Sequence, residues 1–220
     1  MPFLGAPPEK VPRAVIFDIG RVIIRVDLSG WSGTLGGPTG RSHEELLREI
    51  VTDPRWPDWE EGRIDAHSWH QHVCEKFQLA LDFDEFCAIW NSVLCSDTIL
   101  PDTLFEQLAT QCRLALLSNT DPLHVAHFEA NYSFVRHFPA RVYSCRVGCS
   151  KPAPEIYRRA LGETGAAPGE TMFIDDLREN AAAAASLGIH AFHFISAGEL
   201  LSEFSRLGLW TAQPSFLASS

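Results

Sequence analysis

The chain has 220 residues and carries 18 lysines and arginines against 28 aspartates and glutamates, a formal net charge of −10 at pH 7. With 45% hydrophobic and 21% charged residues it has the composition of a globular protein, and its length suits one large domain or a core domain with an insertion. The negative charge repels phosphate backbones and anionic lipid surfaces, so we expect neither a nucleic-acid nor a membrane partner.

Cysteine usage and the first residues of the chain bear on where the protein works. The six cysteines form no Cys-x-x-Cys pair, which argues against a zinc knuckle or a redox motif and favours reduced thiols. Residues 1–13 are proline-rich, and no window approaches about 18 uninterrupted apolar residues. We expect a cytoplasmic protein, either a monomer or a homodimer.

Three short apolar runs, at residues 14–17, 114–117 and 171–174, have the length and composition of buried strands. Helical patterns follow the second and third runs, over residues 122–130 and 178–187. Strands that alternate with helices predict an α/β fold with a parallel sheet.

Between Leu28 and about Leu100 the strand-like runs disappear, and helical patterns cover residues 43–51, 66–77 and 82–94. This change of character predicts a helical insertion after the first strand. The glycine-rich stretch 30–40 suits either a plain linker or a loop that passes close to a ligand. Residues 211–220 lack periodicity, and we expect them to fray.

Polar residues follow each of the three predicted strands, where ligands bind in an open parallel sheet. They are Asp18, the pair Ser118-Asn119 and the pair Asp175-Asp176, and Lys151 precedes a further predicted helix. Adjacent carboxylates repel one another, so a shared pocket favours a cation, and hard oxygen ligands favour Mg²⁺.

A phosphate group fits the remaining side chains of this set. Ser118, the backbone N–H groups near Asn119 and the Lys151 ammonium would hold it. Asp18 would then attack phosphorus and form an aspartyl-phosphate that water hydrolyses.

Four motifs together resemble those of the haloacid dehalogenase superfamily of phosphohydrolases. They are residues 17–22 (FDIGRV), residues 116–120 (LLSNT), Lys151-Pro152 with residues 154–157, and residues 173–176 (FIDD) with Asn180. All four stand in family order over about residues 14–200, which is far more specific than any single short pattern. Motif one and the stretch Gly62-Arg63-Ile64 resemble the subgroup of bacterial α-D-glucose-1-phosphate phosphatases and of the epoxide hydrolase N-terminal domain.

The resemblance implies a Rossmann-like core sheet with helices on both faces and an inserted, all-helical cap that selects the substrate. On this basis residues 1–27 and 98–220 form the core and residues 28–97 the cap. The implied activity is a magnesium-dependent phosphomonoesterase for a small phosphorylated metabolite, with a sugar phosphate as the expected class.

Carried over residue by residue, the resemblance makes Asp18 the nucleophile and a metal ligand. The Gly20 carbonyl, Asp175 and Asp176 complete the metal site. Ser118 and Lys151 hold the phosphoryl group for catalysis, with Asn119 as a further phosphate-binding residue. The guanidinium of Arg21, which the family pattern does not supply, either binds the phosphate as well or points to solvent. Asn180 is expected to brace Asp176 or a metal-bound water.

Two residues depart from the common pattern of these phosphatases. Most of them carry a second aspartate two residues after the nucleophile as general acid and base, and Gly20 stands there. Such a loss can forfeit roughly 10²- to 10⁴-fold in rate. Arg21 replaces the usual glycine or asparagine. Asp27 is either a proton donor at the cap hinge or a helix or turn cap, and the second interpretation is favoured about twofold.

Two other functions compete with the phosphatase. Gly20 and Arg21 also fit a phosphate-binding pseudoenzyme or regulatory protein with little turnover. A haloacid dehalogenase uses an aspartate nucleophile too, but the pair Asp175-Asp176 argues against it, because a haloacid carboxylate gains nothing from a magnesium cluster.

Histidines and tryptophans in the predicted cap have both structural and functional interpretations. His67, His70 and His72 invite a zinc hypothesis, although exposed helix histidines are ordinary. Four tryptophans belong mainly to the core of the cap, and one or two of them would stack on a sugar or ring: Trp56, Trp59, Trp69 and Trp90. Cys145 and Cys149 are expected to be spectators.

Overall fold

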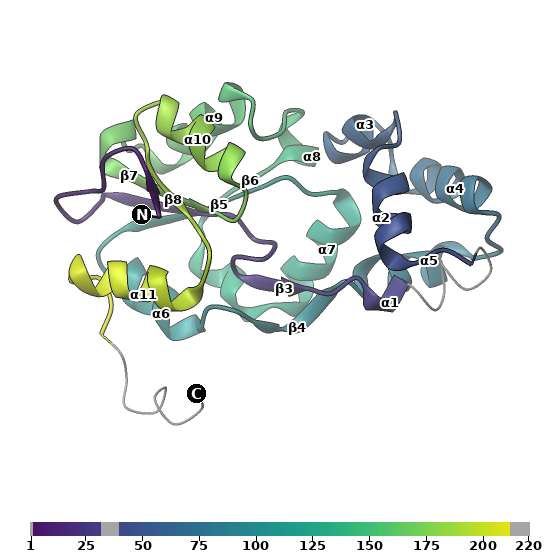
Figure 1. Ribbon diagram of the computed structural model, residues 1–220, viewed down its shortest axis with the longest axis horizontal. Helices are drawn as coiled ribbons and strands as arrows, with labels where there is room; N and C mark the ends of the chain where they lie inside the picture. Colours follow the sequence, from purple (N-terminus) through teal and green to yellow (C-terminus); the bar gives the residue numbers. More distant parts are fainter. Residues whose placement is uncertain (1, 32–39, 212–220) are drawn as a thin grey trace.

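A six-stranded sheet forms the centre of the molecule (Figure 1). The structure, a computed structural model, describes residues 2–31 and 40–211. The strands lie in the order β1-β8-β7-β2-β5-β6, and only β1 runs antiparallel to its neighbour. Their bounds are β1 Phe3–Leu4, β2 Ala14–Phe17, β5 Arg113–Ser118, β6 Ala140–Tyr143, β7 Thr171–Asp175 and β8 His190–His193.

The central strand β2 is buried along its whole length. Its run of apolar and β-branched residues suits a position between two layers of helices, where both faces need side chains to pack. Phe17 lies opposite Leu116 of β5 on one side and Ile174 of β7 on the other. The three strands therefore end at the same edge of the sheet, and the residues that follow them lie together.

Helices cover both faces of the sheet (Figure 1). Val15 and Phe17 point into the cluster formed with α6, α7 and α11, whereas Ile16 points into the cluster formed with α9 and α10. The bounds are α6 Asp102–Ala109, α7 Pro122–Asn131, α8 Ser144–Val147, α9 Pro154–Thr164, α10 Arg178–Ser186 and α11 Ala197–Arg206, with short 3₁₀ turns at Ser133–His137 and Pro168–Glu170. The prediction of a Rossmann-like α/β core is confirmed.

The inserted helices lie beside the sheet and pack around a cluster of buried side chains of their own (Figure 1). Their bounds are α1 Ser29–Trp31, α2 His43–Val51, α3 Trp56–Glu60, α4 Ala66–Phe77 and α5 Phe83–Asn91. Ser42, Asp65 and Asp82 cap α2, α4 and α5 by accepting backbone N–H groups, which explains where these helices begin. Of the five tryptophans in this segment, Trp59, Trp69 and Trp90 are fully buried in this cluster.

Two antiparallel strands, β3 Ile24–Val26 and β4 Leu94–Thr98, join these helices to the sheet. The predicted helix over residues 82–94 was too long, because α5 ends at Asn91 and Leu94 begins β4. Residues 94–98 are only partly buried and carry polar side chains, so hydrophobic periodicity gave no strand signal. Backbone pairing with β3 makes the strand instead.

Parts of the chain fall beyond the residues that the structure describes. Of the glycine-rich stretch 30–40, residues 32–39 lie outside them, as do residues 212–220 of the expected fraying end. Within 2–31 and 40–211, none of the helices has the length and apolarity that a bilayer crossing requires.

Candidate active site

Three carboxylates meet at the edge where the parallel strands end. Asp18 follows β2, Asp175 is the last residue of β7, and Asp176 comes next. Each offers an oxygen within 4.8 Å of the others. The structure thus brings together three side chains that the sequence placed in one metal site.

Lys151 reaches into this cluster from the loop before α9. Its Nζ lies 2.9 Å from Oδ1 of Asp18 and 2.6 Å from Oδ2 of Asp175. Burial alone would lower the pKa of Lys151, but the two carboxylates outweigh that effect and raise it. The buried lysine therefore stays protonated and neutralises part of the cluster's negative charge.

The cluster keeps an excess of negative charge beside Lys151. Burial raises the pKa of Asp18, and the Asp175 carboxylate raises it further, while Lys151 opposes both only in part. Burial also raises the pKa of Asp176, and the charge of Asp18 adds to this. Carboxyl groups that raise one another's pKa in this way are stabilised in the charged form by a divalent cation. Mg²⁺ prefers such oxygen ligands.

Asp175 accepts more hydrogen bonds than the other two carboxylates of the cluster. Its Oδ1 accepts the Leu177 N–H, and both of its oxygens accept from Asn180 Nδ2, at 3.1 and 3.2 Å. Asn180 was expected to brace Asp176 or a metal-bound water, but in the structure it bonds to Asp175, the other member of the pair. Asn180 sits in the first turn of α10, above the end of β7, whereas Asp176 lines the open cleft.

Ser118 and Asn119 stand at the end of β5, as predicted. Ser118 is buried beside the site. The Asn119 side chain joins two loops, because its Oδ1 accepts the Lys151 N–H at 2.7 Å and its Nδ2 donates to the Lys151 carbonyl at 2.9 Å. Asn119 therefore positions Lys151, and only its backbone stays available for a phosphate group.

Gly20 and Arg21 form the turn after Asp18 and line the cleft. Arg21 has a φ of 58°, the left-handed region that glycine or asparagine adopts more easily. Its N–H donates to the Ile24 carbonyl at 2.8 Å, which fixes the turn, and its side chain is exposed. Asp27 accepts the Ser29 N–H at 2.9 Å, the contact of a turn cap.

A cleft of about 280 Å³ opens beside the carboxylate cluster, and Asp176 is the member of the cluster that lines it. The loops after β2 and β7 contribute Gly20, Arg21 and Asp176 to the cleft, and helix α3 of the insertion contributes Trp56 and Glu60. The remaining lining residues come from β3, the end of β5, α7 and the loop after β7: Val26, Asn119, Thr120, Asp121, His124 and Leu177. A volume this small suits a small metabolite.

Glu60 is a site residue that sequence reasoning missed. Its Oε2 lies 3.4 Å from Asn119 Nδ2, and burial raises the pKa of its carboxyl despite the nearby Lys151 ammonium. In the sequence, Glu60 lies far from the ends of the predicted strands, where functional residues were expected. The available signal was its position just before Gly62, in the stretch that resembles the phosphatase subgroup.

A buried group of three side chains, also missed, links α7 to helix α5 of the insertion. Asp121 accepts from Trp90 Nε1 at 3.1 Å and from His124 Nδ1 at 2.8 Å, and His124 Nε2 faces the Trp90 carbonyl at 3.1 Å. Both ring nitrogens of His124 thus face groups that only accept, which requires the protonated ring. Burial would lower the pKa of His124, but Asp121 outweighs it and raises the pKa.

The zinc hypothesis gains no support from the three histidines of α4, because their rings contact other groups instead of meeting at one point. His67 stacks on Phe83, His70 faces the Leu81 carbonyl, and His72 pairs with Asp53. In the part of the chain that the structure describes, the three site carboxylates are the only group arranged to hold a metal ion. All six cysteines are free.

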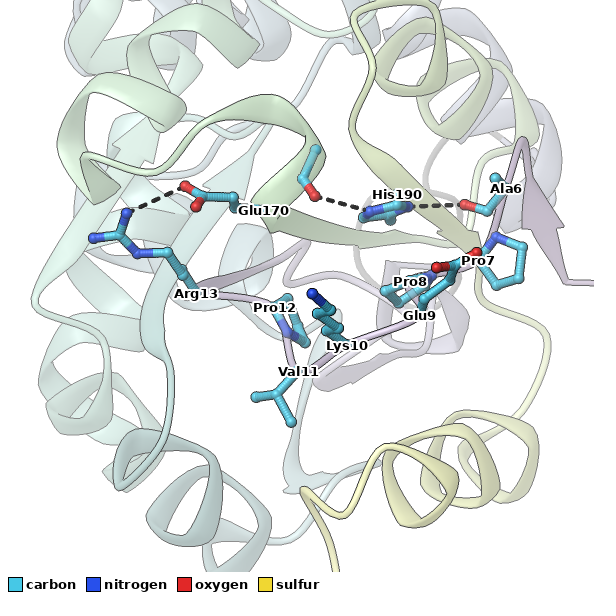
Figure 2. A pocket seen from close by; sticks show the side chains of 11 residues that line it. Ala6, Pro7, Pro8, Glu9, Lys10, Val11, Pro12, Arg13, Glu170 and His190 are labelled. Atoms are coloured by element: carbon cyan, nitrogen blue, oxygen red, sulfur yellow. Dashed lines mark hydrogen bonds and ion pairs between the residues drawn. The ribbon is translucent and has the colours of Figure 1, made fainter.

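A second cavity, of about 380 Å³, lies at the opposite edge of the sheet (Figure 2). It is bounded by residues 6–13 before β2, by residues 169–170 before β7 and by His190 at the start of β8. Figure 2 shows an ion pair between Arg13 and Glu170 and a hydrogen bond between His190 and the Ala6 carbonyl. The three site carboxylates and Lys151 do not line this cavity.

Comparisons with known proteins agree with this geometry. A family model of haloacid dehalogenase-like hydrolases matches residues 12–188. Mouse acyl-CoA dehydrogenase family member 10 is 29% identical over 81% of this chain, which spans only 17% of that protein. The D-ribitol-5-phosphate phosphatase of Bacteroides thetaiotaomicron is 22% identical over 81% of this chain and 89% of its own length.

Solved structures show the same fold. An enzyme of the haloacid dehalogenase family from Bacteroides thetaiotaomicron, in complex with magnesium and inorganic phosphate, has a TM-score of 0.71 and 24% identity over 84% of this chain and 96% of its own. Its magnesium complex has a TM-score of 0.73 and 25% identity, with 90% and 100% covered. The chain therefore belongs to the haloacid dehalogenase-like hydrolases, and its relatives support a phosphatase.

Proposed function

We propose that the protein is a magnesium-dependent phosphomonoesterase that acts on a small phosphorylated metabolite. The observation that carries this proposal is the buried Lys151 ammonium between Asp18 and Asp175, with Asp176 beside them and lining a cleft. We further propose that residues 1–27 and 98–220 are the catalytic core and that residues 28–97 are its cap.

In the proposed mechanism, Asp18 is the nucleophile. One of its carboxylate oxygens forms a bond to phosphorus while the ester P–O bond breaks, and the alcohol leaves. Water then attacks phosphorus, the bond to Asp18 breaks, and inorganic phosphate leaves. Lys151 and Ser118 hold the phosphoryl oxygens, and Lys151 also orients the Asp18 carboxylate.

Asp18, Asp176 and the Gly20 carbonyl would hold Mg²⁺. When bound, the ion offsets the repulsion between the carboxylates and the phosphate dianion. Asp175 was predicted as a further ligand, and its hydrogen bonds from Lys151, Leu177 and Asn180 favour a different task. We propose that Asp175 fixes Lys151 and the start of α10 behind the metal site.

The cleft favours a polyol or sugar phosphate among small phosphate esters. Trp56, which lines the cleft, offers a flat ring on which a sugar or polyol can pack. Arg21, at the mouth of the cleft, would contact the phosphate group. The likeness to a D-ribitol-5-phosphate phosphatase supports this class.

The test is phosphate release from ribitol 5-phosphate, hexose 1-phosphates, flavin mononucleotide and p-nitrophenyl phosphate, each with Mg²⁺ and with a chelator. The Asp18→Asn variant is the control, because it keeps the shape of the nucleophile. We expect release that needs Mg²⁺ and disappears in Asp18→Asn. Binding of phosphate esters without release would favour the pseudoenzyme that Gly20 suggests, and halide release from haloacids without Mg²⁺ would favour a dehalogenase.

A further inference from the structure

Gly20 leaves the site without a carboxyl group two residues after the nucleophile, yet a departing alkoxide needs a proton. The residues that line the cleft include three carboxyl groups: Glu60, Asp121 and Asp176. Asp176 belongs to the metal cluster, and Asp121 already accepts two backbone N–H groups, the Trp90 indole and His124. Glu60 is therefore the carboxyl group of the cleft that neither belongs to the metal cluster nor accepts this set of hydrogen bonds.

The backbone of Glu60 is fixed against the catalytic core. Its carbonyl accepts the Ser144 hydroxyl at 2.7 Å. Two residues later, Gly62 has a φ of +72° and packs so closely that a Cβ would lie 2.0 Å from the Cys145 carbonyl oxygen. The turn after α3 therefore meets α8 by direct backbone contact, and this contact fixes where the Glu60 side chain begins.

The side chain of Glu60 points to the loop that would hold the phosphoryl group. Its Oε2 lies 3.4 Å from Nδ2 of Asn119, the residue after Ser118, at the long end of the hydrogen-bond range. Asn119 is also bonded to the Lys151 backbone. The Lys151 ammonium, by contrast, is taken up by Asp18 and Asp175, so within the described part of the chain no ion pair holds Glu60 in the charged form.

The surroundings of Glu60 favour the protonated form of its carboxyl group more than water does. Burial raises its pKa, and the charges of Asp121 and Glu61 act in the same direction. The Ser150 hydroxyl and the Lys151 ammonium act in the opposite direction without reversing the shift. A carboxyl of this kind can both donate and accept a proton at working pH.

Given the proposed phosphatase activity, we infer that Glu60, a residue of the cap, is the general acid and base of the reaction. As Asp18 bonds to phosphorus and the ester P–O bond breaks, the leaving oxygen takes the proton of the Glu60 carboxyl. The resulting Glu60 carboxylate then accepts a proton from water, whose oxygen bonds to phosphorus while the bond to Asp18 breaks. Both steps balance, and Glu60 ends protonated as it began.

The test uses the dependence on the leaving group, because a general acid matters only where the leaving oxygen is a poor leaving group. In Glu60→Gln, kcat/KM for an alkyl phosphate is expected to fall by roughly 10²- to 10⁴-fold. For p-nitrophenyl phosphate, whose leaving group departs without a proton, it should stay within about tenfold. The ratio kcat/KM is the right quantity, since it reports the step in which the leaving group departs.

Glu61→Gln is the matched control, because it removes the same charge one residue away, where the side chain pairs with Arg63. It should leave both substrates close to wild type. Glu60→Asp keeps the acid and should retain more alkyl phosphate turnover than Glu60→Gln. If Glu60→Gln fails to fold, then Glu60→Ala, which also removes the acid, carries the same comparison of the two substrates.

Equal losses on both substrates, or no loss on either, would overturn the role of Glu60 while leaving the phosphatase intact. A loss confined to KM for hydroxylated substrates would also overturn it and make Glu60 a residue that binds substrate hydroxyls. If the wild-type protein releases no phosphate from either substrate, then the proposed function itself fails.

Discussion

Replacing Lys151 with methionine tests whether this ammonium holds the site together. The side chain is buried, with Nζ at 2.9 Å from Asp18 and 2.6 Å from Asp175. Removing one partner from a buried ion pair costs about 3–5 kcal/mol, because the other charge stays buried without compensation. Lys151 serves two carboxylates, so we expect the upper part of that range, a large share of a stability of about 5–15 kcal/mol.

The assay is urea unfolding at pH 7, followed by circular dichroism, in a chelator and in Mg²⁺. With a urea dependence of about 2 kcal/mol per M, the midpoint of Lys151→Met should fall by about 2 M in the chelator. Mg²⁺ should restore more stability to the variant than it adds to the wild type, because the ion takes over the neutralisation of Asp18. A bound ion at about 100 times its Kd contributes about 2.7 kcal/mol.

Lys76→Met is the control for losing a lysine from an ion pair. Lys76 pairs with Asp53, which keeps His72 and the Arg55 N–H as donors, so the cost should be about 1 kcal/mol. The reasoning is refuted if Lys151→Met costs no more than Lys76→Met, or if Mg²⁺ stabilises both variants and the wild type equally.

Three further predictions concern the contact between α3 and α8, the pair of Asp121 and His124, and the mouth of the cleft. Gly62→Ala should lower the free energy of unfolding by well over the roughly 1–2 kcal/mol that a left-handed backbone costs, and it should lower kcat/KM for phosphate release. Gly148→Ala is the control, because Gly148 has the same φ of +72° but open space around it. It should show only the backbone cost in thermal unfolding and keep its activity. The raised pKa of His124 contributes stability that is complete below pH 6.5 and is lost as the pH rises through the raised value. In His124→Gln, the free energy of unfolding should therefore decline less between pH 6 and 9 than in the wild type. A decline as steep as in the wild type would rule out the pair of His124 and Asp121 as its source. Arg21→Met should raise KM for phosphate esters by roughly 10- to 100-fold with a smaller change in kcat, measured by steady-state kinetics, and an unchanged KM would place the guanidinium outside the substrate contact.

The sequence predicted the central sheet well because its strands are strongly apolar. The buried run 14–17 forms β2 with the expected bounds, and the runs that became β5 and β7 needed only small extensions. The helix over residues 66–77 also has the predicted bounds, because Asp65 caps its start. The strands β1, β6 and β8 were not predicted, since β1 has only two residues and β6 and β8 include polar residues that interrupt an apolar run.

For the site, residues that follow strands could be found, and residues that arrive from the insertion could not. Asp18 and Asp176 meet because parallel strands end at one edge, a rule that needs only the order of strands and helices along the chain. Glu60 reaches the same cleft only because Gly62 docks on the Cys145 backbone, a contact that depends on three-dimensional packing. Asn180 was placed near the correct pair but bonded to Asp175 instead, since a spacing in sequence does not say which of two neighbouring carboxylates a helix faces.

The pairing of β3 with β4 also bears on how this kind of chain diversifies. Ile24, where the chain leaves the core, lies opposite Thr98, where it returns. Because entry and exit are adjacent, the intervening segment can be exchanged for one of different length or shape without moving the strands that carry Asp18 and Ser118. The two-stranded ribbon is therefore a place where the inserted helical segment can be exchanged while the six-stranded sheet stays unchanged.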